Sequence, residues 1–185
     1  MKYLISTVLL LTMSFFLDSC HKKAIDNTPT TIQWMSIEEA ASANAQKPRK
    51  MLVDVYTDWC GWCKRMDAQT FQHPEIAKFV NKNYYAVKLD GEGKQAIQYN
   101  GKTYNNTSGK AHDLAIELLQ GRMGYPSIVF LDEKMQKIQT YPGFQTADKF
   151  DLLLNYYTQD RHKKGEELAT FATTFKSKIT VEAPK

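Results

Sequence analysis

The chain has 185 residues and a formal net charge of +4; 43% of its residues are hydrophobic and 24% are charged. This composition is that of a globular protein with a full core, and it excludes a disordered chain. The lysines and arginines are scattered and form no basic stripe, so a nucleic-acid partner is not expected. Three cysteines are an odd number, which argues against a small secreted domain held together by disulfides.

Residues 1–19 have the pattern of a signal peptide. Lys2 precedes an uncharged apolar stretch over residues 4–17, which suits a signal-peptide core of about 7–15 residues and falls short of the ~20 of a membrane-spanning helix. The letters LDSC that end at Cys20 resemble a bacterial lipobox, which implies cleavage before Cys20 and lipidation of that residue. An ordinary signal peptide with an incidental cysteine and an uncleaved anchor are the alternatives.

The rest of the chain divides into three parts. Residues 20–31 are polar and predict a lipidated tether between a membrane and the folded domain. Residues 32–160 predict the folded domain, and residues 161–185 predict a C-terminal helical extension or tail. The export signal and lipid anchor together predict a protein of the bacterial cell envelope that faces the periplasm.

The first half of the domain alternates helices with strands. Ser36 and Glu39 form a capping box, which predicts a helix that runs to about residue 46. The apolar run over residues 51–56 predicts a buried strand, in which Asp54 is the exception. Cys60 is expected to begin the next helix. A helix from Pro74 and a strand over residues 84–89 follow.

The second half predicts a hairpin, a helix, two strands and a terminal helix. Asn100-Gly101 between two short runs is a hairpin signal. The other expected elements are a helix over 111–118, a buried strand over 127–131, a returning strand over 137–141, an amphipathic helix over 150–157 and a short helix over 168–175. This order predicts an α/β domain with one parallel crossover and one terminal hairpin.

The chemistry is expected at Cys60 and Cys63. Residues three apart share one face of a helix, so the two sulfurs can approach bonding distance. The amino end of a helix favours a thiolate, which is the reactive species in disulfide exchange. Cys60 is therefore expected to attack a substrate disulfide, and Cys63, one turn further in and more buried, is expected to resolve the mixed disulfide.

Two other uses of a CxxC pair fit less well. A structural zinc site needs about four ligands, yet Cys20 lies forty residues upstream and the four histidines are isolated from the pair. Haem attachment requires histidine directly after the second cysteine, and Lys64 stands there. No metal and no bound cofactor are expected, because the dithiol itself carries the electrons.

Three separated motifs resemble the thioredoxin superfamily. VDVYTDWCGWCK over residues 53–64 resembles the active-site strand and helix, GYPS over residues 124–127 resembles the cis-proline loop, and Gly143 stands where thioredoxins usually carry a glycine. The resemblance covers about residues 34–158 and is greatest to exported thioredoxin-like lipoproteins. It implies a thioredoxin-like fold, in which helices flank a central mixed sheet.

The resemblance also implies roles for Asp54 and Pro126. Asp54 matches the buried acid that exchanges a proton with the resolving cysteine; the alternative is an exposed edge residue without a role. A cis bond before Pro126 would place the backbone of Tyr125 beside an extended substrate segment, although most X–Pro bonds are trans.

The residues around the cysteines complete the expected substrate site. Trp59, Gly61 and Trp62 are expected to contact substrate, and for Trp59 a packing role is the alternative. Lys64 either supports the thiolate or is a solvated helix residue. His73 is expected to be structural, and His112 is expected at the surface.

The expected function is that of a thiol–disulfide oxidoreductase acting on protein disulfides or dithiols outside the cytoplasm. Reduction is the expected direction, and it would need a membrane partner as electron donor. The alternative is a lipid-anchored binding or assembly protein in which Cys60 and Cys63 form a structural disulfide or a metal clamp.

Overall fold

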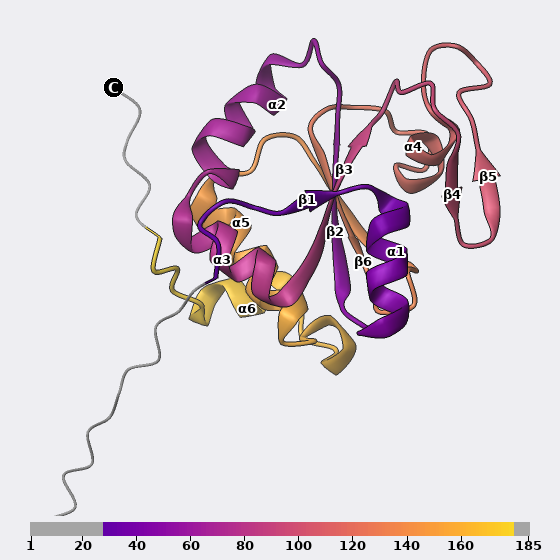
Figure 1. The fold of residues 1–185 in the computed structure, drawn as a ribbon. Helices are drawn as coiled ribbons and strands as arrows, with labels where there is room; N and C mark the ends of the chain where they lie inside the picture. The colour runs from indigo at the N-terminus through magenta and orange to yellow at the C-terminus, as the bar shows by residue number, and fades with distance from the viewer. Residues whose placement is uncertain (1–27, 180–185) are drawn as a thin grey trace, which may run out of the picture.

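The computed structural model describes residues 28–179, so the expected signal peptide and Cys20 lie outside the described residues. Figure 1 shows one sheet with helices on both faces and a small hairpin beside it. The elements are, in order, β1 (Trp34–Met35), α1 (Ile37–Gln46), β2 (Lys50–Tyr56), α2 (Gly61–Met66), a π-helical turn (Asp67–Phe71), α3 (Pro74–Asn83), β3 (Tyr84–Asp90), β4 (Ile97–Tyr99), β5 (Lys102–Tyr104), α4 (Asp113–Leu118), β6 (Ser127–Leu131), β7 (Lys137–Pro142), α5 (Ala147–Thr158), a 3₁₀ turn (His162–Lys164) and α6 (Leu168–Thr174).

The main sheet is mixed, which confirms the predicted fold class. Its strand order is β1-β3-β2-β6-β7. β1 and β2 both run parallel to β3, while β6 is antiparallel to β2 and β7 is antiparallel to β6. α1 and α4 cover one face, and α2, α3, α5 and α6 lie on the other (Figure 1).

Alternation along β2 sends its side chains into two cores. Met51, Val53 and Val55 belong to the core shared with α1 and α4. Leu52 belongs to the core shared with α3 and α5. Because side chains of a strand alternate between its faces, Asp54 points to the same side as Leu52. That face also carries α2, the helix of the cysteines.

The structure adds a strand that the sequence pattern did not predict. β1 has two residues and pairs at the edge of the sheet, with Trp34 opposite Ala86 and Met35 opposite Val87. Two residues are too few to show the alternation that marks a strand. The predicted hairpin is confirmed: β4 and β5 pair antiparallel around Asn100 and Gly101.

The prediction of a surface His112 is wrong, because its side chain is fully buried. Its Nδ1 accepts a hydrogen bond of 3.2 Å from the backbone N–H of Leu114, and its Nε2 bonds to the carbonyl of Gln95 at 3.0 Å. His112 thereby caps α4, which begins at Asp113 and not at residue 111. A polar side chain that satisfies both ring nitrogens with backbone groups can be buried without a hydrogen-bond deficit.

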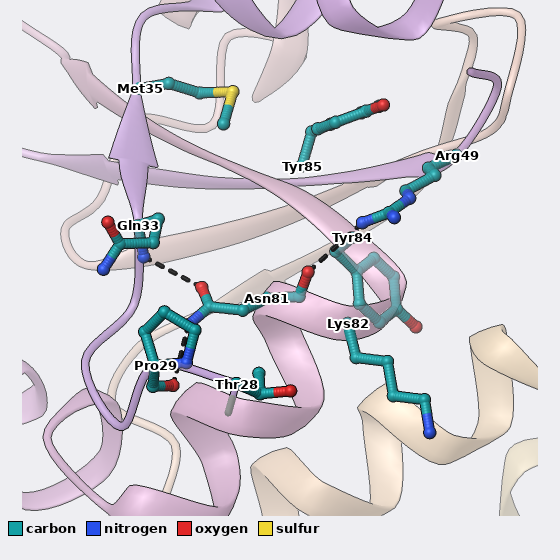
Figure 2. A pocket seen from close by; sticks show the side chains of 9 residues that line it. All are labelled: Thr28, Pro29, Gln33, Met35, Arg49, Asn81, Lys82, Tyr84 and Tyr85. Carbon is teal, nitrogen blue, oxygen red and sulfur yellow. Dashed lines mark hydrogen bonds between the residues drawn. The ribbon is translucent and has the colours of Figure 1, made fainter. Parts of the chain in front are cut away.

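The first described residues are fastened to the end of α3. The Asn81 side chain accepts a hydrogen bond from the backbone N–H of Gln33 and donates to the carbonyls of Pro29 and Thr31. Figure 2 shows Asn81 at the centre of a pocket of about 540 Å³, with Arg49 bonded to its backbone carbonyl. The pocket marks where the chain enters the sheet, and it includes neither cysteine.

The last described helix packs on the domain. Phe171 of α6 is buried, and its ring lies 5.6 Å from that of Tyr156 in α5. Within the expected C-terminal extension, the residues of α6 therefore form a helix that is docked on the domain. Over residues 28–179, each helix falls short of the length or the apolar character needed to cross a bilayer.

Candidate functional site

Cys60 and Cys63 are joined by a disulfide at the amino end of α2, with their Cα atoms 5.3 Å apart. Cys60 is the N-cap residue of that helix, and its Sγ accepts a hydrogen bond of 3.1 Å from the backbone N–H of Cys63. Such a donor aimed at sulfur also stabilises a thiolate when the disulfide is reduced. The spacing of the two cysteines therefore produces the bonded pair that the sequence predicts.

The expected difference in burial between the two cysteines is absent. Cys60 is 4% exposed and Cys63 is 3% exposed. The expectation assumed a free thiol at the helix mouth, whereas in the oxidised pair each sulfur covers the other. Lys64 is exposed on the helix surface, as a solvated helix residue would be.

A cis peptide bond joins Tyr125 to Pro126. The loop is held from both sides, because the Pro126 carbonyl accepts a hydrogen bond of 2.7 Å from the N–H of Gly143, and Ser127 Oγ donates to the Gly124 carbonyl at 2.7 Å. Gly143 has φ +84°, a backbone conformation that favours glycine. The loop leads into β6, which pairs antiparallel with β2 and so begins at the end of β2 that leads to Cys60.

Trp59 and Trp62 form what we call the tryptophan rim. They are 68% and 56% exposed, so the packing role considered for Trp59 does not describe its position. The Trp59 ring meets Tyr125 edge to face at 6.1 Å, and its Nε1 donates to Glu92 at 3.0 Å. The Trp62 ring lies 5.8 Å from Phe144, beyond β7.

Gly91 lets the Tyr125 ring lie against the end of β3. A methyl group on Gly91 would sit 2.5–2.7 Å from three atoms of the Tyr125 side chain, two of the ring and the hydroxyl oxygen, which is closer than atoms can pack. Gly91 N–H also donates to the Tyr56 carbonyl, at the end of β2. The segment after β3, which the sequence did not connect to the site, thus supports one of its walls.

Asp54 is buried, with 1% of its surface exposed. Burial raises its pKa to about 6, even though the Lys88 ammonium, 2.7 Å from Oδ2, acts to lower it. The other oxygen, Oδ1, has no hydrogen-bond partner among the described residues. Asp54 is therefore a carboxyl group that can change protonation near neutral pH.

Lys88 is a residue of this site that sequence reasoning missed. Its ammonium also lies 2.6 Å from Asp67 Oδ1, in the π-helical turn that follows α2. Rings of three aromatic residues surround it at 4.9–5.4 Å, a distance suited to cation–π contact. These residues are Trp34, Tyr56 and Phe71. Lys88 lies directly opposite Asp54 in the parallel pairing of β2 with β3. Its part in the site follows from the register of that pairing, which the sequence pattern does not show.

Among residues 28–179, no three histidine, cysteine or acidic side chains lie close enough together to hold a metal ion. His73 caps α3 through a hydrogen bond from the backbone N–H of Glu75, which fits the structural role expected of it. Gly61 is the first residue of α2, between the two cysteines. Cys20 lies outside the described residues.

A family model described as a thioredoxin-like domain matches residues 37–158, which is more than half of the chain. The chain belongs to the thioredoxin-like family. This confirms the resemblance seen in the three motifs. The family model spans all three, from the active-site strand to the glycine after β7.

Curated relatives of this thioredoxin-like chain include two thiol:disulfide interchange proteins DsbD. That of Haemophilus influenzae strain 86-028NP is 29% identical over 136 residues, and that of Pectobacterium atrosepticum is 24% identical over 140 residues. These matches cover 70% and 75% of this chain but 21% of each relative. The chain thus spans about a fifth of the length of these relatives.

Solved structures show the same fold. A thioredoxin from Thermus thermophilus has a TM-score of 0.54 at 18% identity, covering 74% of this chain and 94% of that one. An oxidoreductase named DsbH has a TM-score of 0.51 at 19% identity, covering 72% of this chain and 88% of the other. The likeness covers most of the length of each of these two proteins.

Proposed function

We propose that this chain is a thiol–disulfide oxidoreductase that acts on protein disulfides or dithiols. The observation that carries the proposal is the Cys60–Cys63 disulfide at the amino end of α2, in a chain whose cis Tyr125–Pro126 loop and exposed tryptophan rim belong to the same site. The relatives named thiol:disulfide interchange proteins point to the same chemistry. Exposed aromatic surface beside a reactive pair is suited to a protein substrate.

In the reducing direction the dithiol form begins the reaction. The Cys60 thiolate attacks one sulfur of the substrate disulfide, forming a mixed disulfide and releasing the other substrate sulfur as a thiolate, which takes up a proton. Cys63, as a thiolate, then attacks Cys60 Sγ, which forms the Cys60–Cys63 disulfide and releases the second substrate thiol. Two electrons pass from the protein to the substrate, and the reverse sequence oxidises a dithiol.

Asp54 is the proposed acceptor for the proton that Cys63 loses. Its carboxyl group lies on the face of the sheet that carries α2, and its Oδ1 has no partner among the described residues that would compete for the proton. Because its pKa is raised to about 6, Asp54 is a better base than an ordinary aspartate and is still ionised at neutral pH.

The proposed setting is the bacterial cell envelope. We propose that Cys20 carries a lipid that anchors the chain, that the domain faces the periplasm, and that the working direction is reduction. In an oxidising compartment a reductase needs a donor of two electrons for each turnover, so a membrane-bound dithiol protein is the proposed partner. Mass spectrometry of the mature N-terminus tests the anchor, and an unacylated Cys20 would refute it.

Insulin reduction with dithiothreitol as electron donor tests the activity. The wild-type chain is expected to accelerate the reaction, and Cys60→Ser is expected to lose at least ~100-fold in rate, since the attacking sulfur is gone. Cys63→Ser, pre-reduced, freed of dithiothreitol and then mixed with insulin, should instead trap the mixed disulfide, visible as a covalent adduct on a non-reducing gel. A wild-type chain that leaves insulin intact, or a Cys60→Ser variant as active as the wild type, would favour a binding protein with a static disulfide.

A further inference from the structure

Within the part of the chain that the structure describes, the large apolar side chains that are exposed lie around the Cys60–Cys63 pair. Among residues 28–179, the large hydrophobic side chains that are exposed are Trp59, Trp62 and, at 39%, Met123. The two tryptophans flank Cys60, and Met123 comes directly before the loop that holds Tyr125. Exposed apolar groups gathered at one place mark a surface that contacts a partner.

The side of this surface next to Trp59 is acidic. The Glu92 carboxylate accepts the hydrogen bond from Trp59 Nε1. Burial, followed by the negative charges of Glu92 and Asp90, raises the pKa of Tyr125, so both acids lie near that ring. Asp58 is the exposed neighbour of Trp59 in the chain.

The side next to Trp62 is basic. The Arg65 guanidinium lies over the Trp62 ring at 5.1 Å and over the Phe144 ring at 5.7 Å. Its Nε donates to Gln69 at 3.1 Å, which fixes the orientation of the group. No carboxylate within the described part of the chain forms an ion pair with Arg65. Its positive charge therefore remains available to a partner, on an aromatic surface that is poorly hydrated.

We propose that this surface selects substrate segments that carry an acidic side chain on one side of the reacting cysteine and a basic side chain on the other. Arg65 and Glu92 are the specificity-determining residues. The inference rests on the proposed function, because it assumes that a substrate cysteine reaches Cys60. An extended segment advances ~3.3 Å per residue. Residues a few positions to either side of that cysteine can therefore reach Glu92, beside Trp59, and Arg65, beside Trp62.

Because Glu92 and Arg65 carry opposite charges, the rate of reduction should depend on the order of charges along the substrate. A segment in the favoured order meets an opposite charge at both residues, whereas the reversed segment meets a like charge at both. Such complementarity acts mainly on orientation and on the rate of productive encounter. Partly exposed pairs of this kind are individually weak, so we expect a preference of about three- to tenfold.

Two synthetic peptides of identical composition provide the test. One has aspartate before and lysine after a central cysteine, the other has the reverse order, and each is used as its disulfide-linked dimer. Pre-reduced protein is mixed with each peptide for a single turnover, in which the Cys60–Cys63 dithiol supplies the two electrons and no other donor is needed. The wild-type chain should reduce one order about three- to tenfold faster, and the preference should shrink in high salt.

Charge-neutral variants assign the effect to residues. Arg65→Gln and Glu92→Gln should each reduce the preference, and the double variant should lose it; Gln at position 92 keeps an acceptor for Trp59. Lys134→Gln, in the exposed turn between β6 and β7, is the matched control and should keep the preference. Equal rates for the two peptides in the wild type, or a preference that survives in the double variant, would overturn the inference. Failure to reduce either peptide or insulin would instead refute the proposed function.

Discussion

Two lysines bridge two carboxylates each, at opposite ends of neighbouring strands. Lys50, at the start of β2, lies 2.6 Å from Glu133 and 2.8 Å from Asp160. Lys88, near the end of β3, lies 2.7 Å from Asp54 and 2.6 Å from Asp67. The distances are alike, yet the pKa values of Glu133 and Asp160 are lowered while the pKa of Asp54 is raised.

The extent to which each carboxyl group is buried explains why the pKa shifts differ in direction. Glu133 and Asp160 are 35% and 38% exposed, and although burial acts to raise their pKa, the nearby charges of Lys50 and Lys163 together lower the pKa of both. Asp54 is buried, and burial prevails over Lys88. The Lys50 group therefore stabilises the fold, while the Lys88 group holds a carboxyl group ready to change protonation.

The largest expected effect comes from Asp54→Asn. The pKa of Asp54 is raised from 3.8 to about 6, so its ionised form destabilises the native state at neutral pH, and this cost disappears as pH falls below 4. The variant should raise the free energy of unfolding at pH 7 by about 1–3 kcal/mol, measured by urea denaturation of the oxidised protein. Its turnover should fall about tenfold, because Cys63 loses its proton acceptor.

The pH dependence of this gain provides the decisive control. Repeating the denaturation at pH 4 should remove most of the gain in stability, since wild-type Asp54 is then protonated in the native state. A variant that is less stable than the wild type at pH 7 would show that Asp54 acts as an ordinary ion-pair partner of Lys88.

Lys50→Met should have the opposite sign. Since Glu133 and Asp160 have a lowered pKa in the native state, they contribute stability above their unfolded pKa and lose it as pH falls. Both are more than a third exposed and screened by solvent, so the variant should lose only about 1 kcal/mol at pH 7. Insulin reduction should be unchanged.

Lys163→Met is the matched control for this loss. Lys163 contacts the same two acids but is 48% exposed, so its removal should cost less than that of Lys50. If Lys50→Met reduced the rate of insulin reduction, the separation of the two lysine groups into a stabilising and a chemical one would be wrong.

Gly91→Ala is expected to act on stability and on substrate binding, each to a modest extent. The added methyl group would displace the Tyr125 ring and with it the wall that supports Trp59. We expect a loss of about 1 kcal/mol in stability and a two- to fivefold rise in KM for a peptide disulfide. Gly124→Ala, which meets no atom within 4 Å, should leave stability nearly unchanged. Equal effects of both changes would count against a fixed Tyr125.

Patterns of neighbouring residues predicted most of the helices and strands and, at the site, the pairing of Cys60 with Cys63. The apolar run of β2 and the capping box at Ser36 identify their elements, since each depends on neighbours in the chain. The spacing of Cys60 and Cys63 predicts their bond for the same reason. The cis bond before Pro126 came only from the resemblance to a family, because the base rate for X–Pro bonds favours trans.

The features that were missed depend on contacts between distant parts of the chain. Lys88 meets Asp54 because β2 and β3 pair in one register, and no local pattern encodes a parallel register. His112 is buried because the carbonyl of Gln95, far along the loop, completes its hydrogen bonds. Trp34 belongs to β1 only because β3 is there to pair with it.

The Asn81 clamp has a mechanical consequence. Three of the incoming chain's backbone groups, on Pro29, Thr31 and Gln33, bond to one side chain of α3. A tensile load applied to the backbone before Thr28 is therefore transferred to α3 before it reaches Trp34, whose ring lies over the Lys88 ammonium. The three hydrogen bonds of Asn81 therefore stand between a pull on the leading end and the aromatic surroundings of Lys88.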